Sequence, residues 1–203
     1  MVPKARRGSP RLNSAGYSLI EILIVVGLIG VISAMAIPMT GNSLKSFRIS
    51  GDARTLTNTV SLAKMRAAST FARARVYVDL DASNYHVETQ TTAGAAWVTE
   101  GATIPLSTGV SLGFSSLTTA PPSTQATLAQ APQCRTAADV AIGNTACVVF
   151  NSRGIPIDSS ASPTALDGVY LTDMTSVYGV TVAASGLIQL WTSKASTATW
   201  TKQ

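Results

Sequence analysis

A single carboxylate, that of Glu21, stands at the start of a long apolar run in this 203-residue chain. The residues from Ile22 to Ile37 are almost all apolar, and the next charged residue after Glu21 is Lys45. A charge at membrane depth is costly, so a residue of this kind marks a functional site by default. The pattern predicts a membrane-spanning helix in which Glu21 has a specific role.

A short basic leader precedes the apolar run. Residues 1–16 contain four basic and no acidic side chains, which leaves 11 Lys and Arg against 10 Asp and Glu in the rest of the chain. The net charge of +5 therefore falls to +1 without the leader, and a general argument for nucleic-acid binding from basic charge fails. Because positive charge stays on the cytoplasmic side of a first hydrophobic segment, we expect the chain after about Pro38 to lie on the other side of the membrane.

The apolar segment has the length of a membrane span. Tyr17–Ile37 covers 21 residues, close to the roughly 20 that cross a bilayer, whereas a secretory signal has only about 7–15 apolar residues before its cleavage site. Here the small residue, Gly16, comes before the apolar run, so a cut after Gly16 leaves the helix on the mature protein. We expect a cleaved leader (1–16), a transmembrane helix (17–43) and an exported β-rich domain (44–203).

Beyond the apolar run the pattern becomes that of an amphipathic helix. Pro38 and the following Gly41–Ser43 predict a kink or a locally melted stretch, because proline lacks an N–H and crowds the preceding turn. A second helical stretch is expected from about Leu44 to Ala74, so that one helix of roughly fifty residues, bent near Pro38, packs on a sheet. Its apolar residues recur at steps of three or four: Leu56, Val60, Ala63, Ala67 and Phe71.

The rest of the chain shows the alternation of β-strands. Arg75–Leu80 and Asn84–Glu88, separated by a turn-like segment, predict a hairpin. Residues 115–132, which have no charge and are rich in Ser, Thr, Ala, Pro and Gln, predict a long and partly mobile surface loop. The predicted fold class is α+β, with the N-terminal helix packed on an antiparallel sheet. Further strands are expected at Trp97–Thr99, Val110–Phe114, Ala146–Asn151, Val177–Ala183 and Leu187–Thr192.

No grouping of side chains in the sequence indicates catalysis or metal binding. Cys134 and Cys147, in the part expected outside the membrane, are most simply a disulfide, with two buried reduced thiols as the alternative. His86, the only histidine, is distant from them in sequence, so no zinc ligand set is visible. We therefore expect no enzyme activity, cofactor or metal.

Residues 16–38, GYSLIEILIVVGLIGVISAMAIP, resemble the N-terminal signature of type IV pilins and the related pseudopilins. The resemblance implies that a prepilin peptidase cuts after Gly16 and that the new N-terminal residue, Tyr17, is N-methylated, although the family more often has Phe there. It implies that Glu21 pairs with the N-terminal amine of a neighbouring subunit during assembly, since a buried unpaired charge is strongly destabilising. It also implies a helix that bends or melts at Pro38. The implied partners are the peptidase, other pilin subunits and the inner membrane, and the implied location of residues 44–203 is the periplasm and then a pilus or pseudopilus.

The globular part is similar to the GspH/FimT minor pilin group in residues 62–68, 148–156 and 180–189. In some members of that group the last turn has arginines just after its glycine and binds DNA for uptake. Here those positions hold Leu187, Ile188 and Gln189. The resemblance therefore implies a structural minor subunit of a type II secretion or type IV pilus machine. A DNA-uptake or adhesive minor pilin, a major pilin, and a tethered domain that never assembles are the alternatives.

Overall fold

The structure, a computed structural model, describes residues 16–165 and 167–203, and in the long helix the side chains of residues 35–42 fall outside that description. Apart from Gly16, the predicted leader thus lies outside the described residues. The chain forms two compact units, Met1–Asn42 and Ser43–Gln203.

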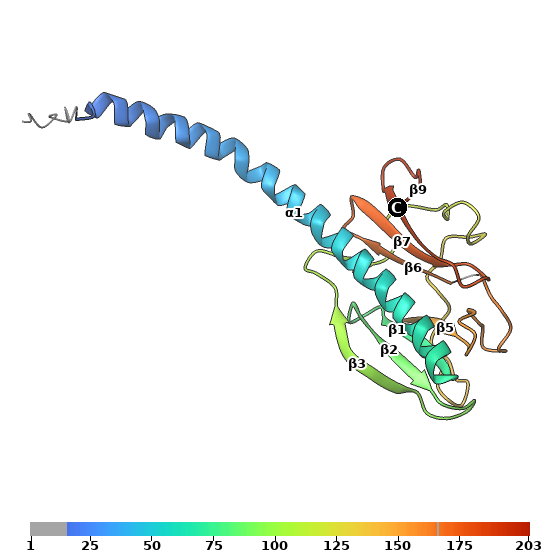
Figure 1. Ribbon diagram of the computed structural model, residues 1–203. Helices are drawn as coiled ribbons and strands as arrows, with labels where there is room; N and C mark the ends of the chain where they lie inside the picture. The colour runs from blue at the N-terminus through green and yellow to red at the C-terminus, as the bar shows by residue number, and fades with distance from the viewer. Residues whose placement is uncertain (1–15, 166) are drawn as a thin grey trace, which may run out of the picture. The chain divides into compact units, whose positions relative to one another are not determined.

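Helix α1 runs from Leu19 to Thr70 as a single element of 52 residues (Figure 1). The predicted helix of roughly fifty residues is therefore confirmed. The locally melted alternative at Pro38–Ser43 is wrong, because the helix continues through this stretch. Proline removes one helical hydrogen bond, and a long helix can absorb that loss. The bend at Pro38 stays a prediction.

Helix α1 ends earlier than its apolar spacing predicts. Phe71 has a φ of 52°, and the N–H of Ala72 donates to the carbonyl oxygen of Ala67 at 3.2 Å. This is the hydrogen bond of a Schellman motif, in which one residue in the left-handed region closes the helix. The Phe71 side chain is 85% exposed, so its predicted place on the core face is wrong.

Every strand in the described residues pairs antiparallel, in two sheets. Sheet A has the order β3-β2-β1-β5, and sheet B has the order β4-β6-β7-β8-β9. Sheet A consists of β1 (Arg73–Asp79), β2 (Asn84–Gln90), β3 (Val98–Pro105) and β5 (Thr145–Phe150). Sheet B consists of β4 (Ser111–Leu112), β6 (Asp167–Thr172), β7 (Ser176–Val182), β8 (Ile188–Lys194) and β9 (Thr201–Lys202).

The predicted hairpin is confirmed as β1 and β2, whose register pairs Arg73 with Gln90 and Asp79 with Asn84. Sequence alternation misses β6, because all of its residues are buried and a strand buried on both faces loses the period of two. It also misses β9, which is too short to show a period. The other expected strands are present, with β3 longer and β4 shorter than predicted.

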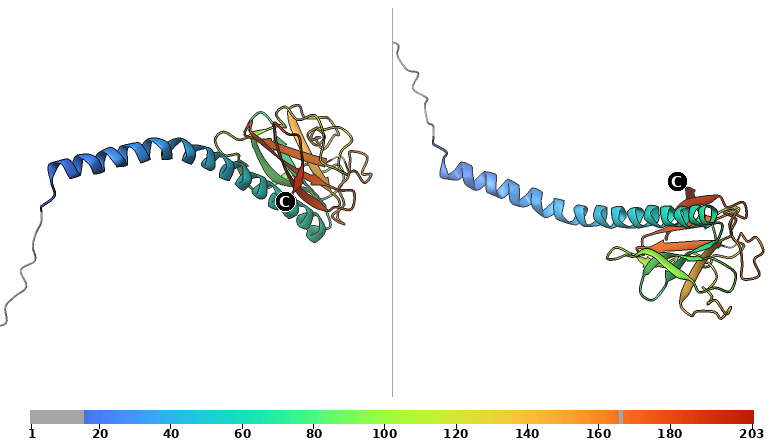
Figure 2. Two further views of the ribbon diagram at one scale, coloured as in Figure 1. Left: turned by 90° about the horizontal axis from the view of Figure 1, so that it is seen from above. Right: turned by 60° about the horizontal axis from the view of Figure 1, so that its bottom comes forward.

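The core of the second unit lies between α1 and both sheets (Figure 2). The helix contributes a stripe of buried residues at helical spacing, four of which the sequence predicts. Three of the six are alanines, which let the helix approach the sheets closely. The stripe consists of Ile49, Ala53, Leu56, Val60, Ala63 and Ala67.

Loop 115–132 is fastened to sheet B at several points. The Gln130 side chain accepts from the backbone N–H of Tyr170 at 2.9 Å and donates to its carbonyl oxygen at 3.0 Å. The Tyr170 hydroxyl donates to Gln125 at 2.7 Å, and the Trp200 indole donates to the carbonyl oxygen of Thr119 at 2.7 Å. These contacts join the loop to β6 and to Trp200, while the predicted mobility of the loop stays a prediction.

Candidate functional site

The predicted cleavage site lies immediately before α1. The carbonyl oxygen of Ser18 accepts the first helical hydrogen bonds, from the N–H groups of Glu21 at 3.0 Å and Ile22 at 3.2 Å. Tyr17 is 79% exposed, and a Cβ built on Gly16 would meet no atom within 4 Å. The fold of the described chain therefore does not require glycine at residue 16. A need for glycine there would instead come from another protein, such as a protease that recognises this residue.

Glu21 lies in the first turn of α1. A carboxylate there is favoured by the partial positive charge of the helix N-terminus. Ser18 and Glu21 also have the spacing of a capping box, a helix-start signal that is present in the sequence itself. Glu21 is thus placed to stabilise the start of the helix in the free subunit, in addition to any role between subunits.

The first unit has an extensive exposed apolar surface on α1. Between Ile22 and Ile32 every large side chain is apolar and about half exposed or more. A helix that is apolar around its whole circumference is normally buried in a protein interior or a membrane, and extensive exposed apolar surface marks an interaction site. This surface is the principal candidate site of the first unit.

Among the residues that the structure describes, no helix meets the length and apolarity of a membrane span. The predicted span over Tyr17–Ile37 is therefore not confirmed.

The predicted disulfide is confirmed: Cys134 and Cys147 form a bridge across 13 residues of sequence. The bridge holds the segment 132–141 against β5, where the N–H of Cys134 donates to Thr145 Oγ1 at 3.0 Å. Held in this way, the segment forms one wall of a cavity.

Reduction of the Cys134–Cys147 bridge is expected to destabilise the second unit by about 3 kcal/mol, because the closed loop no longer restricts the unfolded chain. For a unit of this size the expected drop in Tm is roughly 6–12 °C. Thermal unfolding followed by circular dichroism, with and without reductant, measures the change. A Cys134→Ala/Cys147→Ala variant should match the reduced protein, and equal Tm values with and without reductant would contradict the prediction.

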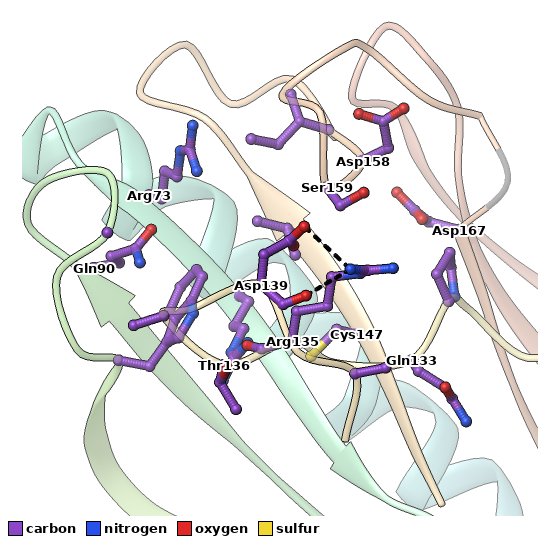
Figure 3. A pocket seen from close by; sticks show the side chains of 18 residues that line it. Arg73, Gln90, Gln133, Arg135, Thr136, Asp139, Cys147, Asp158, Ser159 and Asp167 are labelled. Carbon is purple, nitrogen blue, oxygen red and sulfur yellow. Dashed lines mark hydrogen bonds and ion pairs between the residues drawn. The ribbon is translucent and has the colours of Figure 1, made fainter. Parts of the chain in front are cut away.

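The cavity has a volume of about 380 Å³ and lies over one end of sheet A (Figure 3). Its walls come from the starts of β1 and β6, the end of β2, β5, the segment 132–141 and the segment 157–159. Six charged side chains line it: Arg73, Arg75, Arg135, Asp139, Asp158 and Asp167. No motif in the sequence indicates this site, because its walls meet only through sheet pairing and the disulfide.

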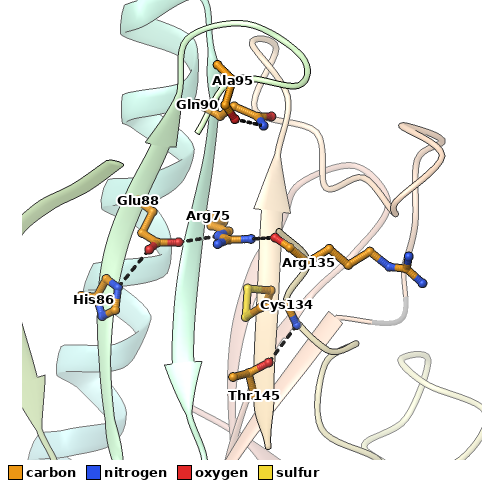
Figure 4. A network of polar contacts seen from close by, with 9 residues as sticks. Arg75, His86, Glu88, Gln90, Ala95, Cys134, Arg135 and Thr145 are labelled. Atoms are coloured by element: carbon orange, nitrogen blue, oxygen red, sulfur yellow. Dashed lines mark hydrogen bonds and ion pairs between the residues drawn. A yellow bond between two sulfur atoms is a disulfide. The ribbon is translucent and has the colours of Figure 1, made fainter. Parts of the chain in front are cut away.

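Arg75 anchors a polar network beside the cavity (Figure 4). It is 3% exposed, and its Nε donates to Glu88 Oε2 at 2.5 Å. Its Nη1 donates to the carbonyl oxygen of Arg135 at 2.6 Å, and its guanidinium lies 4.0 Å from the ring centroid of Trp97. Burial lowers the pKa of Arg75, and the Glu88 carboxylate opposes that effect. His86 Nε2 lies 3.3 Å from Glu88 Oε1.

Two residues that line the cavity each have one buried oxygen atom without a hydrogen-bond partner. These atoms are Asp167 Oδ2 and Gln90 Oε1, in residues that are 2% and 3% exposed. Burial, and secondarily the charge of Asp158, raises the pKa of Asp167 to about 7. Unpartnered buried acceptors are rare and costly, so each requires an explanation. Among the described residues no three His, Cys, Asp or Glu gather as a metal site would need.

The three segments quoted for the GspH/FimT resemblance meet in the structure. Lys64 of α1 donates through Nζ to the carbonyl oxygen of Gly186 at 2.8 Å. A Cβ built on Gly186 would lie 2.4 Å from the carbonyl oxygen of Gly154, so these two turns pack backbone against backbone. Leu187, at a position where some members of that group have arginine, is an exposed apolar residue of this turn.

Residues 11–37 match the family model described as the prokaryotic N-terminal methylation motif. This is a type IV pilin-like signal, and it indicates a pilin-like precursor that a prepilin peptidase processes. The match includes Gly16, Tyr17 and Glu21 and none of the second unit. No curated protein and no solved structure significantly matches the chain.

Proposed function

We propose that this chain is a structural minor pilin or pseudopilin subunit of a type II secretion or type IV pilus machine. The observation that supports the proposal is the coincidence of the methylation motif with the uncovered apolar surface of α1. In this proposal the apolar helix first holds the subunit in the inner membrane and then packs against the helices of other subunits in a filament. The periplasmic domain does no chemistry and uses no cofactor.

Within this proposal Gly16 is the processing residue and Glu21 the assembly residue. Cleavage after Gly16 frees the amine of Tyr17, which becomes buried among apolar side chains when subunits pack. Glu21 of one subunit neutralises the amine of its neighbour, and Pro38 lets the helix adapt to the filament. The meeting of residues 62–68, 148–156 and 180–189 in one place supports a minor subunit of the GspH/FimT type.

The test of processing is the intact mass of the protein purified from membranes of cells that have or lack prepilin peptidase. With the peptidase we expect loss of Met1–Gly16 and a gain of one methyl group on Tyr17, and without it the full precursor. A Gly16→Val variant should remain uncut, while its fold is unaffected because the site is open. An uncut wild-type chain in peptidase-positive cells would favour a tethered domain that never assembles.

Glu21→Gln is expected to reduce incorporation into sheared filaments at least about a hundredfold, since an uncompensated buried charge costs about 3–5 kcal/mol. Processing should remain unchanged, which the intact mass checks. Glu100→Gln is the matched control, because Glu100 is a partly exposed carboxylate of the second unit that pairs with Arg66 at 2.9 Å. Filaments of Glu21→Gln at wild-type yield would refute the assembly role.

A further inference from the structure

The cavity over sheet A has the features of a binding site that the structural role does not explain. Its volume of about 380 Å³ falls in the range of small-molecule pockets, about 300–1,000 Å³. Asp167 and Gln90 both line it, and their buried oxygen atoms Asp167 Oδ2 and Gln90 Oε1 have no hydrogen-bond partner. Gln90 Oε1 and the ionised Asp167 carboxylate are acceptors, so the groups that complete them must be donors.

The charges that line the cavity decide the sign of that donor group. Arg75 is neutralised by Glu88, and Arg135 pairs with Asp139 at 3.2 Å. The remaining charges are the carboxylates of Asp158 and Asp167 against the single guanidinium of Arg73. Asp158 keeps its charge, because hydrogen bonds from Ser160 and Ser162 lower its pKa.

In Figure 3 Asp158 and Asp167 lie on one side of the cavity, and Gln90 and Arg73 lie on the other. Negative charge is therefore in excess at the Asp158–Asp167 side. We propose that this cavity binds a ligand with a guanidinium or primary ammonium group, which donates hydrogen bonds to the Asp167 carboxylate. A cation beside Asp167 is attracted by the Asp158 carboxylate as well. In a ligand long enough to cross the cavity, a second N–H group donates to Gln90 Oε1. Ligand binding at this site requires no filament, so the experiment below tests it independently of the structural role proposed above.

Binding of such a cation is coupled to the protonation of Asp167. The pKa of about 7 leaves this carboxyl mostly neutral at pH 6 and mostly ionised at pH 8. A cation prefers the ionised form, so its affinity should rise about tenfold over this interval. The other charged groups that line the cavity are Arg73, Arg75, Arg135, Asp139 and Asp158.

The experiment titrates butylguanidinium into the full chain in detergent micelles at pH 8 by isothermal titration calorimetry. Butylurea, which has nearly the same shape and no charge, is the matched probe. We expect saturable binding of butylguanidinium, weaker binding at pH 6, and no measurable binding of butylurea. A blocked Gly-Arg-Gly peptide distinguishes the source: if it binds at least as well, the ligand is a side chain of another protein, and if only butylguanidinium binds, the ligand is a small molecule.

Asp167→Asn should weaken butylguanidinium binding about tenfold or more, because it removes a charge-assisted hydrogen bond. Asp158→Asn, which retains the oxygen that accepts from Ser162, should weaken binding less. Asp81→Asn is the matched control, since Asp81 is an exposed residue outside the cavity. Absence of butylguanidinium binding, equal binding of butylurea, or unchanged affinity in folded Asp167→Asn would overturn the proposal and leave a cavity that holds water only.

Discussion

Asp167→Asn is expected to stabilise the protein at pH 8 by up to about 4 kcal/mol and to have little effect at pH 4. Asp167 has a pKa of about 7 in the folded protein against an ordinary 3.8, and this difference converts to about 4 kcal/mol. In the unfolded chain Asp167 is solvated, so it ionises near its ordinary pKa. Asparagine has nearly the same shape and avoids the cost of burying a charge without a partner.

The sign of the pH dependence follows from the raised pKa. Below about pH 4 Asp167 is protonated in both the folded and the unfolded states, so it adds no penalty. Between about pH 4 and pH 7 the folded state retains the proton that the unfolded state has lost, so the free energy of unfolding falls as the pH rises. Above about pH 7 the penalty is complete and constant.

The measurement is denaturant unfolding of both proteins at pH 4, 6 and 8 in detergent, followed by tryptophan fluorescence. The difference in unfolding free energy between Asp167→Asn and wild type should grow from pH 4 to pH 8. Asp81→Asn, which removes a carboxylate at an exposed turn position, is the matched control. A pH-independent difference for Asp167→Asn would show that Asp167 is ionised and solvated throughout.

The parts of the fold that depend on local periodicity could be predicted from the sequence. The buried stripe of α1 at Leu56, Val60, Ala63 and Ala67 follows from the helical period, and the hairpin β1–β2 follows from alternation and a polar turn. The end of the helix could not be predicted in this way. It depends on Phe71 adopting a left-handed conformation, which no apolar pattern specifies.

The processing site and the cavity also differ in whether the sequence predicts them. Gly16 and Glu21 were identified because their signal is contained in one short stretch of sequence. Gln90 and Asp167 were not, because the cavity exists only after two sheets, a disulfide and the segment 132–141 are assembled. Asp167 is also the first residue of β6, the strand that sequence alternation misses. Local patterns thus reveal the processing signal and not the cavity.

Arg75→Met is expected to destabilise the protein by about 3–5 kcal/mol, the typical cost of breaking a buried ion pair from one side. The change leaves the Glu88 carboxylate buried without its cation, and Arg75 and Glu88 are directly opposite each other in the β1–β2 register. It also removes the hydrogen bond to the Arg135 carbonyl and the stacking on Trp97. Methionine retains most of the apolar volume of the arginine stem, so the loss is chiefly electrostatic.

Two further variants separate the charge effect from general disruption of the core. Arg75→Met/Glu88→Leu should recover most of the stability, because two apolar side chains replace a buried ion pair at little or no cost. Arg66→Met removes a cation from an exposed pair whose side chains are 50% and 32% exposed, so it should cost less than about 1 kcal/mol. Denaturant unfolding of the four proteins gives these differences directly. If Arg75→Met costs no more stability than Arg66→Met, the Arg75–Glu88 pair is hydrated in solution. If the double variant is less stable than Arg75→Met, the loss of stability comes from packing and not from an uncompensated charge.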